Sequence, residues 1–153
     1  MSYTKSPDHC FFQNKNYNLY HIAELNLLIV EARGLVQLAF AQEAWYKAID
    51  KAVEFKALKW LIDGSAIELV DLKASEWLSK ELFPVLGEKL DYPGQRITAN
   101  VLPARFYAEM SSKDLMKKKL EHDTTASEGG IQRVFQNFKT FEEAYEWVVN
   151  HQE

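Results

Sequence analysis

The chain has 153 residues, of which 47% are hydrophobic and 26% are charged, and its formal net charge is -4. These values are typical of one globular domain whose core needs no metal or disulfide, and they exclude a largely disordered chain. The acidic balance gives no general attraction to phosphate backbones, so nucleic acid is not an expected partner.

Cys10 is the single cysteine, so the chain can form no internal disulfide and carries no CxxC pattern for zinc or redox chemistry. The first eight residues lack the apolar core of a signal peptide, and no apolar run approaches the length of a bilayer-spanning helix. We therefore expect a cytoplasmic protein with no transmembrane segment and no cofactor.

The N-terminal part predicts a hairpin and a helix. Residues 1–10 are polar and are expected to be frayed. Strand-favouring residues over Tyr17–Glu24 and Leu27–Arg33 predict a hairpin that ends before Gly34. Between Leu38 and Phe55, the apolar positions share one helical face, which predicts a helix. These positions are Ala41, Ala44, Trp45, Ala48, Ile49, Ala52 and Val53.

The stretch KWLIDGS, residues 59–65, is predicted to contain the central strand. Trp60, Leu61 and Ile62 favour strands and do not alternate with polar residues, as is typical of a strand covered on both faces. Asp63-Gly64-Ser65 is turn chemistry, so the strand is expected to end there. The carboxyl end of this strand is then the expected functional edge of the sheet.

The second half predicts further helices and strands. Asp71 can cap a helix that runs to about Leu90 and breaks near 82–84, because a proline inside a helix removes a hydrogen bond. A strand is predicted over 96–102, a helix over 104–120, a mobile loop over 121–130 and a strand over 131–138. Thr140 and Glu143 predict a capping box at the start of the last helix. Together the elements predict a single α/β domain over 1–153, with a mixed sheet of about five strands, an N-terminal hairpin and about four helices.

The order of these elements, with the segments KWLIDGS, WLSKELFPVLGEKL, RITANVLP and FKTFEEAYEWV, resembles the STAS domain group. The closest likeness is to its stand-alone bacterial branch, which is similar to the sporulation anti-sigma factor antagonist. The resemblance runs from about Tyr17 to Trp147 and implies a small cytoplasmic regulator that binds a partner protein or small ligand, with no catalytic centre. In regulated members, a partner kinase phosphorylates a serine before the helix that follows the central strand. Asp71-Leu72-Lys73 has no hydroxyl group at that place, so phosphorylation is left open between Ser65 and Ser75.

A polar site is expected at the carboxyl edge of the sheet. There Asp63 and Ser65 would lie near Glu68 and Asp71 and face Arg105, forming a surface for a protein partner or a site for an anion. The alternative is that Asp63 and Ser65 only form a turn.

An apolar site is the rival expectation. Trp60, Trp77, Phe83 and Tyr92 lie near the Pro84 break, which could leave a pocket between the helix and the sheet for a lipid or another apolar small molecule. The stand-alone branch is also described as similar to lipid-binding Sec14 domains, which leaves the same ligand class open. Exposed aromatic side chains would also allow a homodimer.

Catalytic and metal-binding residues do not converge in the sequence. The four histidines, His9, His21, His122 and His151, lie in unrelated segments, and the neighbouring His9 and Cys10 are interpreted as a chance pair. The lysines at 113 and 117–119 are interpreted as a solvated helix end. We therefore expect neither an enzyme nor a metal site.

Overall fold

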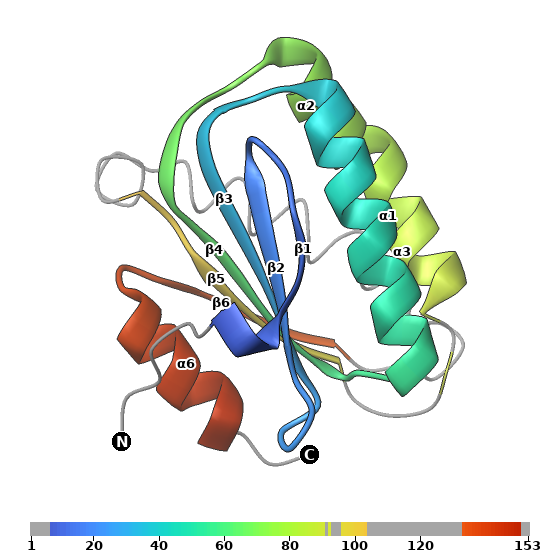
Figure 1. Ribbon diagram of the computed structural model, residues 1–153, viewed down its shortest axis with the longest axis vertical. Helices are drawn as coiled ribbons and strands as arrows, with labels where there is room; N and C mark the ends of the chain where they lie inside the picture. Colours follow the sequence, from blue (N-terminus) through green and yellow to red (C-terminus); the bar gives the residue numbers. More distant parts are fainter. Residues whose placement is uncertain (1–6, 91, 93–95, 104–132, 151–153) are drawn as a thin grey trace.

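The computed structural model describes residues 7–90, 92, 96–103 and 133–150 (Figure 1). The helix predicted over 104–120, the loop predicted over 121–130 and Arg105 lie outside the described residues.

A six-stranded mixed sheet forms the centre of the described fold, with the strands in sequence order. They are β1 (Cys10–Gln13), β2 (Tyr17–Ile22), β3 (Leu27–Val36), β4 (Lys59–Val70), β5 (Arg96–Val101) and β6 (Arg133–Phe138). Neighbours from β1 to β3 are antiparallel, and neighbours from β3 to β6 are parallel. The predicted α/β class and N-terminal hairpin are confirmed. The sheet has one strand more than predicted, because Cys10–Gln13 pairs with β2. A 3₁₀ turn, Pro7–His9, precedes it within the stretch predicted to be frayed.

Helices lie on both faces of the sheet (Figure 1). On one face are α1 (Leu38–Phe55) and the helical run of α2 (Leu72–Trp77), η2 (Leu78–Leu82) and α3 (Phe83–Lys89), and on the other is α6 (Phe141–Asn150). The helix predicted over 38–55 is confirmed, and six of its seven predicted apolar positions are buried. The seventh, Val53, is 42% exposed because it lies at the rim of the apolar stripe.

Two hydrophobic clusters fill the space between the sheet and its helices. Alternate residues of β3 divide between them, since successive strand side chains point to opposite faces. Leu28 and Val30 join the cluster beneath α1, α2 and α3, whereas Leu27 and Ile29 join the cluster beneath α6. The core therefore has two layers, one on each face of β3 and β4.

The central strand is longer than the sequence predicts. β4 continues to Val70, so the expectation that it ends at Asp63-Gly64-Ser65 is wrong. β3 also continues past Gly34, and the two strands stay paired as far as Val36 and Val70. The ladder is irregular at two places, where β4 advances by one residue more than β3, and these β-bulges absorb the turn-forming residues without ending the strand.

The carboxyl ends of β3 and β4 continue past the point where β5 stops pairing with β4. Among the described residues, β5 pairs with β4 only as far as Asp63 and Val101. Residues 64–70 of β4 then have β3 as their strand neighbour. We call Arg33–Val36 together with Gly64–Val70 the β3–β4 arm.

The helix after β4 is widened where a break is predicted. Asp71 caps it as expected, since its carboxylate accepts the N–H of Lys73 at 3.2 Å. The helix then passes from α2 through the π-helical turn η2 directly into α3, so the predicted break near 82–84 is wrong. A π turn shifts the hydrogen-bonding register by one residue, and Pro84 falls in the first turn of α3, where its missing N–H is not needed.

The last predicted elements agree with the structure where it describes them. β5 and β6 occupy the predicted strand segments, and Thr140 Oγ1 accepts the N–H of Glu143 at 3.2 Å at the start of α6. Ala144 and Val148 of α6 are buried. In the described part of the chain, no helix has the length and hydropathy needed to cross a bilayer.

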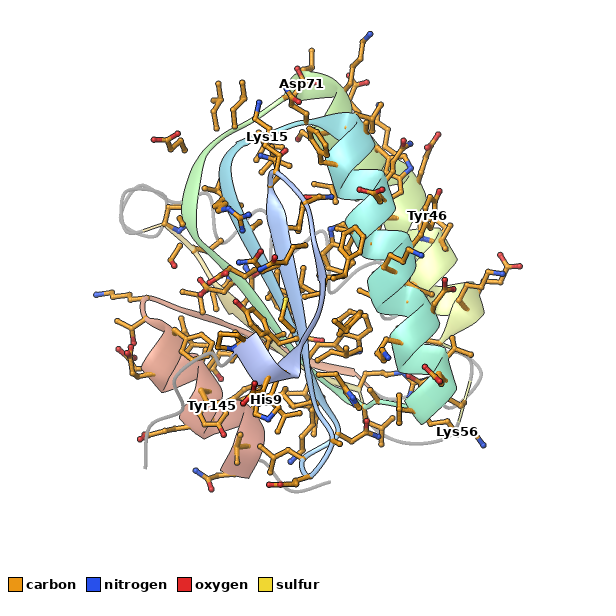
Figure 2. The ribbon with its side chains drawn as sticks, in the orientation of Figure 1. His9, Lys15, Tyr46, Lys56, Asp71 and Tyr145 are labelled. Carbon is orange, nitrogen blue, oxygen red and sulfur yellow. The ribbon has the colours of Figure 1, made fainter. Side chains whose placement is uncertain are left out.

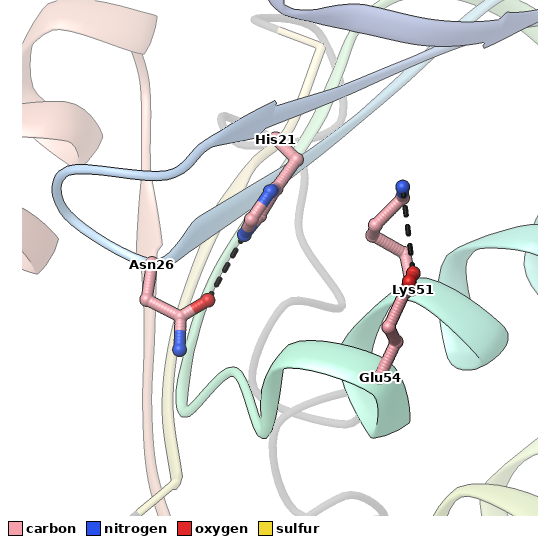
Figure 3. A network of polar contacts seen from close by, with 4 residues as sticks. All are labelled: His21, Asn26, Lys51 and Glu54. Carbon is pink, nitrogen blue, oxygen red and sulfur yellow. Dashed lines mark hydrogen bonds and ion pairs between the residues drawn. The ribbon is translucent and has the colours of Figure 1, made fainter.

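Polar contacts lie within the hairpin turn and on the last turns of α1 (Figure 3). His21 Nε2 lies 2.9 Å from Asn26 Oδ1, and Asn26 Nδ2 donates to the carbonyl of Phe55 at 2.8 Å. On α1 itself, Lys51 and Glu54 form an ion pair at 3.6 Å. Asn26 therefore holds the hairpin turn against α1, and His21 has the structural role of positioning Asn26.

Candidate functional site

The predicted pair Asp63 and Ser65 is brought together at the first bulge of β4. Asp63 is 2% exposed, and its Oδ1 accepts the Ser65 hydroxyl at 2.6 Å and the Ser65 backbone N–H at 3.0 Å. An aspartate that bonds the backbone two residues on is ordinary turn chemistry. Here that chemistry shapes a bulge, while Ser65 itself is exposed.

Glu68 and Asp71 do not converge with Asp63. Both are exposed, and both lie further along the arm or at its end. Because a strand rises by about 3.3 Å per residue and the two bulges take up two residues of β4, Asp71 is roughly 20 Å from Asp63. Glu68 and Asp71 are therefore not brought to Asp63, because the turn expected at Asp63-Gly64-Ser65 is absent.

A polar row crosses the α6 face of the sheet beside Asp63. Asn18, Glu31 and Asp63 are register partners on β2, β3 and β4. Asn18 Nδ2 donates to Glu31 Oε1 at 2.9 Å, and the Tyr20 hydroxyl lies 3.4 Å from the same oxygen. Sequence reasoning does not find this row, because only the register shows that three separate polar residues are neighbours.

The carboxyl end of the sheet also carries three exposed leucines. We call Leu35, Leu69 and Leu72 the leucine tip; they are 46%, 60% and 72% exposed. Leu35 and Leu69 are partners in the β3–β4 ladder, and Leu72 is the first residue of α2. The signal in the sequence was the pattern Glu68-Leu69-Val70-Asp71-Leu72, which a turn at residues 63–65 would have placed in a loop.

Asn16 fixes the position of the arm. Its side chain is 2% exposed, and Nδ2 donates to the carbonyls of Arg33 at 3.1 Å and Leu35 at 2.9 Å. Its Oδ1 accepts the N–H of Gln37 at 3.1 Å. The arm is therefore held by the turn between β1 and β2 as well as by its own ladder.

Three of the four residues predicted for an apolar pocket lie in one buried cluster. Trp60, Trp77 and Tyr92 are 4%, 6% and 9% exposed and belong to the cluster beneath α1, α2 and α3. The Trp60 and Trp45 rings stack with centroids 6.0 Å apart. The side chain of Phe83 lies outside what the structure describes.

Tyr92 is fixed at the edge of this cluster. Its hydroxyl donates to the carbonyl of Ala57 at 2.5 Å, and the guanidinium of Arg96 lies over its ring, 4.2 Å from the centroid. Burial raises the pKa of Tyr92 above its usual value of 10.0, and the charge of Arg96 lowers it in part. These contacts hold the segment after α3 against the start of β4.

The two serines considered for phosphorylation are both exposed, Ser65 on the arm and Ser75 on α2. In the described ranges, no group of three or more His, Cys, Asp or Glu side chains is placed to hold a metal ion.

No protein-family model matches the chain, and no curated protein matches it by sequence. Among solved structures, the chain is similar to an uncharacterised protein of the DUF3478 family, with a SpoIIAA-like fold, from Shewanella loihica PV-4. The two are 14% identical, the alignment covers 90% of this chain and 98% of that one, and the TM-score is 0.45. The α/β class stated above rests on the strands and helices of this chain.

Proposed function

We propose that the chain is a non-enzymatic regulatory module of the cytoplasm that binds a protein partner through the carboxyl edge of its sheet. The observation that most supports the proposal is the exposure of Leu69 and Leu72 at that edge, 60% and 72%. Grouped apolar side chains that a folded chain leaves in water are typical of protein interaction sites. Ser65 and Glu68 lie along the arm and Asp71 follows it, and the three supply a polar rim, which is the usual composition of such a site.

The contacts at the arm also favour binding over catalysis. Ser65 is an exposed hydroxyl beside a carboxylate, but the same Asp63 oxygen also accepts the Ser65 backbone N–H. Activation of a serine requires a base that can take and return its proton, which in serine nucleophiles is typically a histidine held by a third group. His21 is engaged with Asn26 at the opposite end of the hairpin.

Capture of partners from the native cell tests this function. Tagged wild-type chain should retain a partner, and Leu69→Glu should abolish retention because it places a charge in the apolar centre of the contact. Val53→Glu is the matched control, since Val53 is 42% exposed but lies on α1. Charge changes at Ser65 and Asp71 should weaken retention. A wild-type chain that retains nothing, or a partner indifferent to all of these changes, would contradict the proposal.

A second function, as carrier of an apolar ligand, is supported by a buried indole N–H that has no hydrogen-bond partner. Trp60 is 4% exposed, and its Nε1 has no hydrogen-bond partner in the described part of the chain. A buried N–H without a partner costs roughly 1–3 kcal/mol. An apolar ligand carrying a carbonyl or carboxylate oxygen beside Trp60 would remove that cost.

Oleate is a suitable probe for this second function. Its binding should shift the indole N–H resonance of Trp60 in a nitrogen-15 correlation spectrum and raise the melting temperature. Trp45 is the internal control, because its indole already hydrogen-bonds Tyr17. An unchanged Trp60 resonance at saturating oleate would exclude this ligand class at this site.

A further inference from the structure

We propose that the leucine tip is a self-association surface and that its occupant is a second copy of this chain. The inference rests on the proposed function, because it names the protein that covers the same edge. Leu35 and Leu69 lie side by side as ladder partners. Leu72 lies beside the end of β3, since the Asp71 N–H donates to the carbonyl of Val36 at 2.9 Å.

Leu35 and Leu69 point away from the core beneath α1. Val36 and Val70 are the next pair of the ladder, and they pack into the cluster beneath α1, α2 and α3. Because successive residues of a strand point to opposite faces, Leu35 and Leu69 point to the other face of the sheet. There they remain 46% and 60% exposed. Asn16 holds this part of β3 in place, so the apolar surface is formed before any partner arrives.

The charges around the tip favour a copy of the same chain over a partner of one charge sign. The exposed acids Glu68 and Asp71 and the exposed lysines Lys15 and Lys73 lie at this end of the fold. Figure 2 shows Lys15 and Asp71 at the same end of the molecule as the ends of β3 and β4. In a two-fold contact the same patch meets itself, so it must be self-complementary. An apolar centre with two acids and two lysines around it satisfies that requirement, whereas a strongly acidic or basic partner would meet as much repulsion as attraction.

Sedimentation velocity of the full chain over roughly 1–100 μM tests the inference. We expect a reversible monomer–dimer equilibrium. Leu69→Glu should raise the dissociation constant at least about thirtyfold, because it truncates a central apolar contact and places two like charges close together across the two-fold axis. Val53→Glu should leave the dissociation constant unchanged. Circular dichroism should be the same for both variants, since both positions are exposed.

A charge exchange tests the self-complementary part of the argument. Lys73→Glu leaves three acids and one lysine around the tip and should weaken the dimer. Adding Glu68→Lys restores two of each sign and should recover the dimer. A wild-type chain that stays monomeric over the whole range, or a dimer weakened by Val53→Glu and not by Leu69→Glu, overturns the inference. If a monomeric chain still captures another protein in a Leu69-dependent way, the proposed function stands and the inference fails.

Discussion

The Ser65 hydroxyl donates to Asp63 Oδ1 at 2.6 Å, and the same carboxylate oxygen accepts the Ser65 backbone N–H at 3.0 Å. Asp63 is buried and belongs to the polar row that crosses β2, β3 and β4. A modification of Ser65 therefore acts on the first bulge of the arm, because the hydroxyl is one of the groups that hold Asp63.

Ser65→Ala and Ser65→Asp should separate the two consequences of such a modification. Ser65→Ala loses one hydrogen bond to a carboxylate and should lower the free energy of unfolding by about 1 kcal/mol. Ser65→Asp loses the same bond and adds a negative charge beside Asp63, so it should cost roughly 1 kcal/mol more. Urea denaturation of both variants checks the order. Equal stability of the two variants would show that the acid at residue 65 turns away from Asp63 into water.

Local chemistry predicted most of the elements but not the length of the central strand. The helix at Leu38–Phe55, the cap at Asp71 and the strand at Arg96–Val101 follow from spacing and residue type within each segment. Asp63-Gly64-Ser65 has the composition of a turn. The hydrogen bond typical of such a turn, from the Ser65 backbone N–H to the Asp63 side chain, is present. The strand nevertheless continues, because β3 offers a partner as far as Val36, and that pairing is a property of the ladder.

The candidate site could be predicted only in part for the same reason. The carboxyl end of β4 was the expected edge, but Asp63 and Ser65 meet at a bulge within the strand, before that end. The leucine tip exists because the arm extends as far as Val70, and Asn16 supports it through partners 17, 19 and 21 residues away in sequence. No local pattern marks a buried asparagine whose partners are that distant.

Replacement of Asn16 should be among the more damaging changes at a polar position. Asn16→Asp keeps the shape but turns the Nδ2 donor into an oxygen that faces the carbonyls of Arg33 and Leu35. The buried repulsion and the lost bonds should lower the free energy of unfolding by roughly 3 kcal/mol. Chemical denaturation measures the loss. Asn150→Asp is the control, because it makes the same amide-to-acid change at an exposed position. Similar stability of the two variants would contradict the role given to Asn16.

Gly34 and Gly64 should respond differently to an added methyl group. Gly34 has φ +70, and an added Cβ would lie 4.0 Å from Asn16 Nδ2, an ordinary van der Waals contact, so Gly34→Ala should cost about 1 kcal/mol through backbone strain. Gly34→Asn should cost less, since asparagine tolerates that conformation. At Gly64 an added Cβ would lie 3.2 Å from the carbonyl oxygen of Val101 and 3.1 Å from Ile67 Cδ1, so the cost there is steric. Denaturation of the wild type, Gly34→Ala, Gly34→Asn and Gly64→Ala measures these costs. A Gly34→Asn variant that loses as much stability as Gly34→Ala would contradict the strain argument.

Tyr17 should make the fold sensitive to alkaline pH. Burial raises the pKa of Tyr17 from 10.0 to about 12, although a hydrogen bond from Trp45 lowers it in part. The unfolded chain therefore loses this proton at lower pH than the folded chain does. The associated stability is fully present below pH 10 and falls as the pH rises towards 12, by up to about 3 kcal/mol. Burial raises the pKa of Tyr92 as well, which acts in the same direction. The free energy of unfolding of the wild type should thus decline between pH 10 and 12. In Tyr17→Phe it should decline less steeply over the same range. The stability of this variant at neutral pH is lower, because the hydrogen bond from Trp45 is lost. Phenolate absorbance recorded alongside denaturation checks the cause, and a parallel decline in both proteins would show that Tyr17 is not the group responsible.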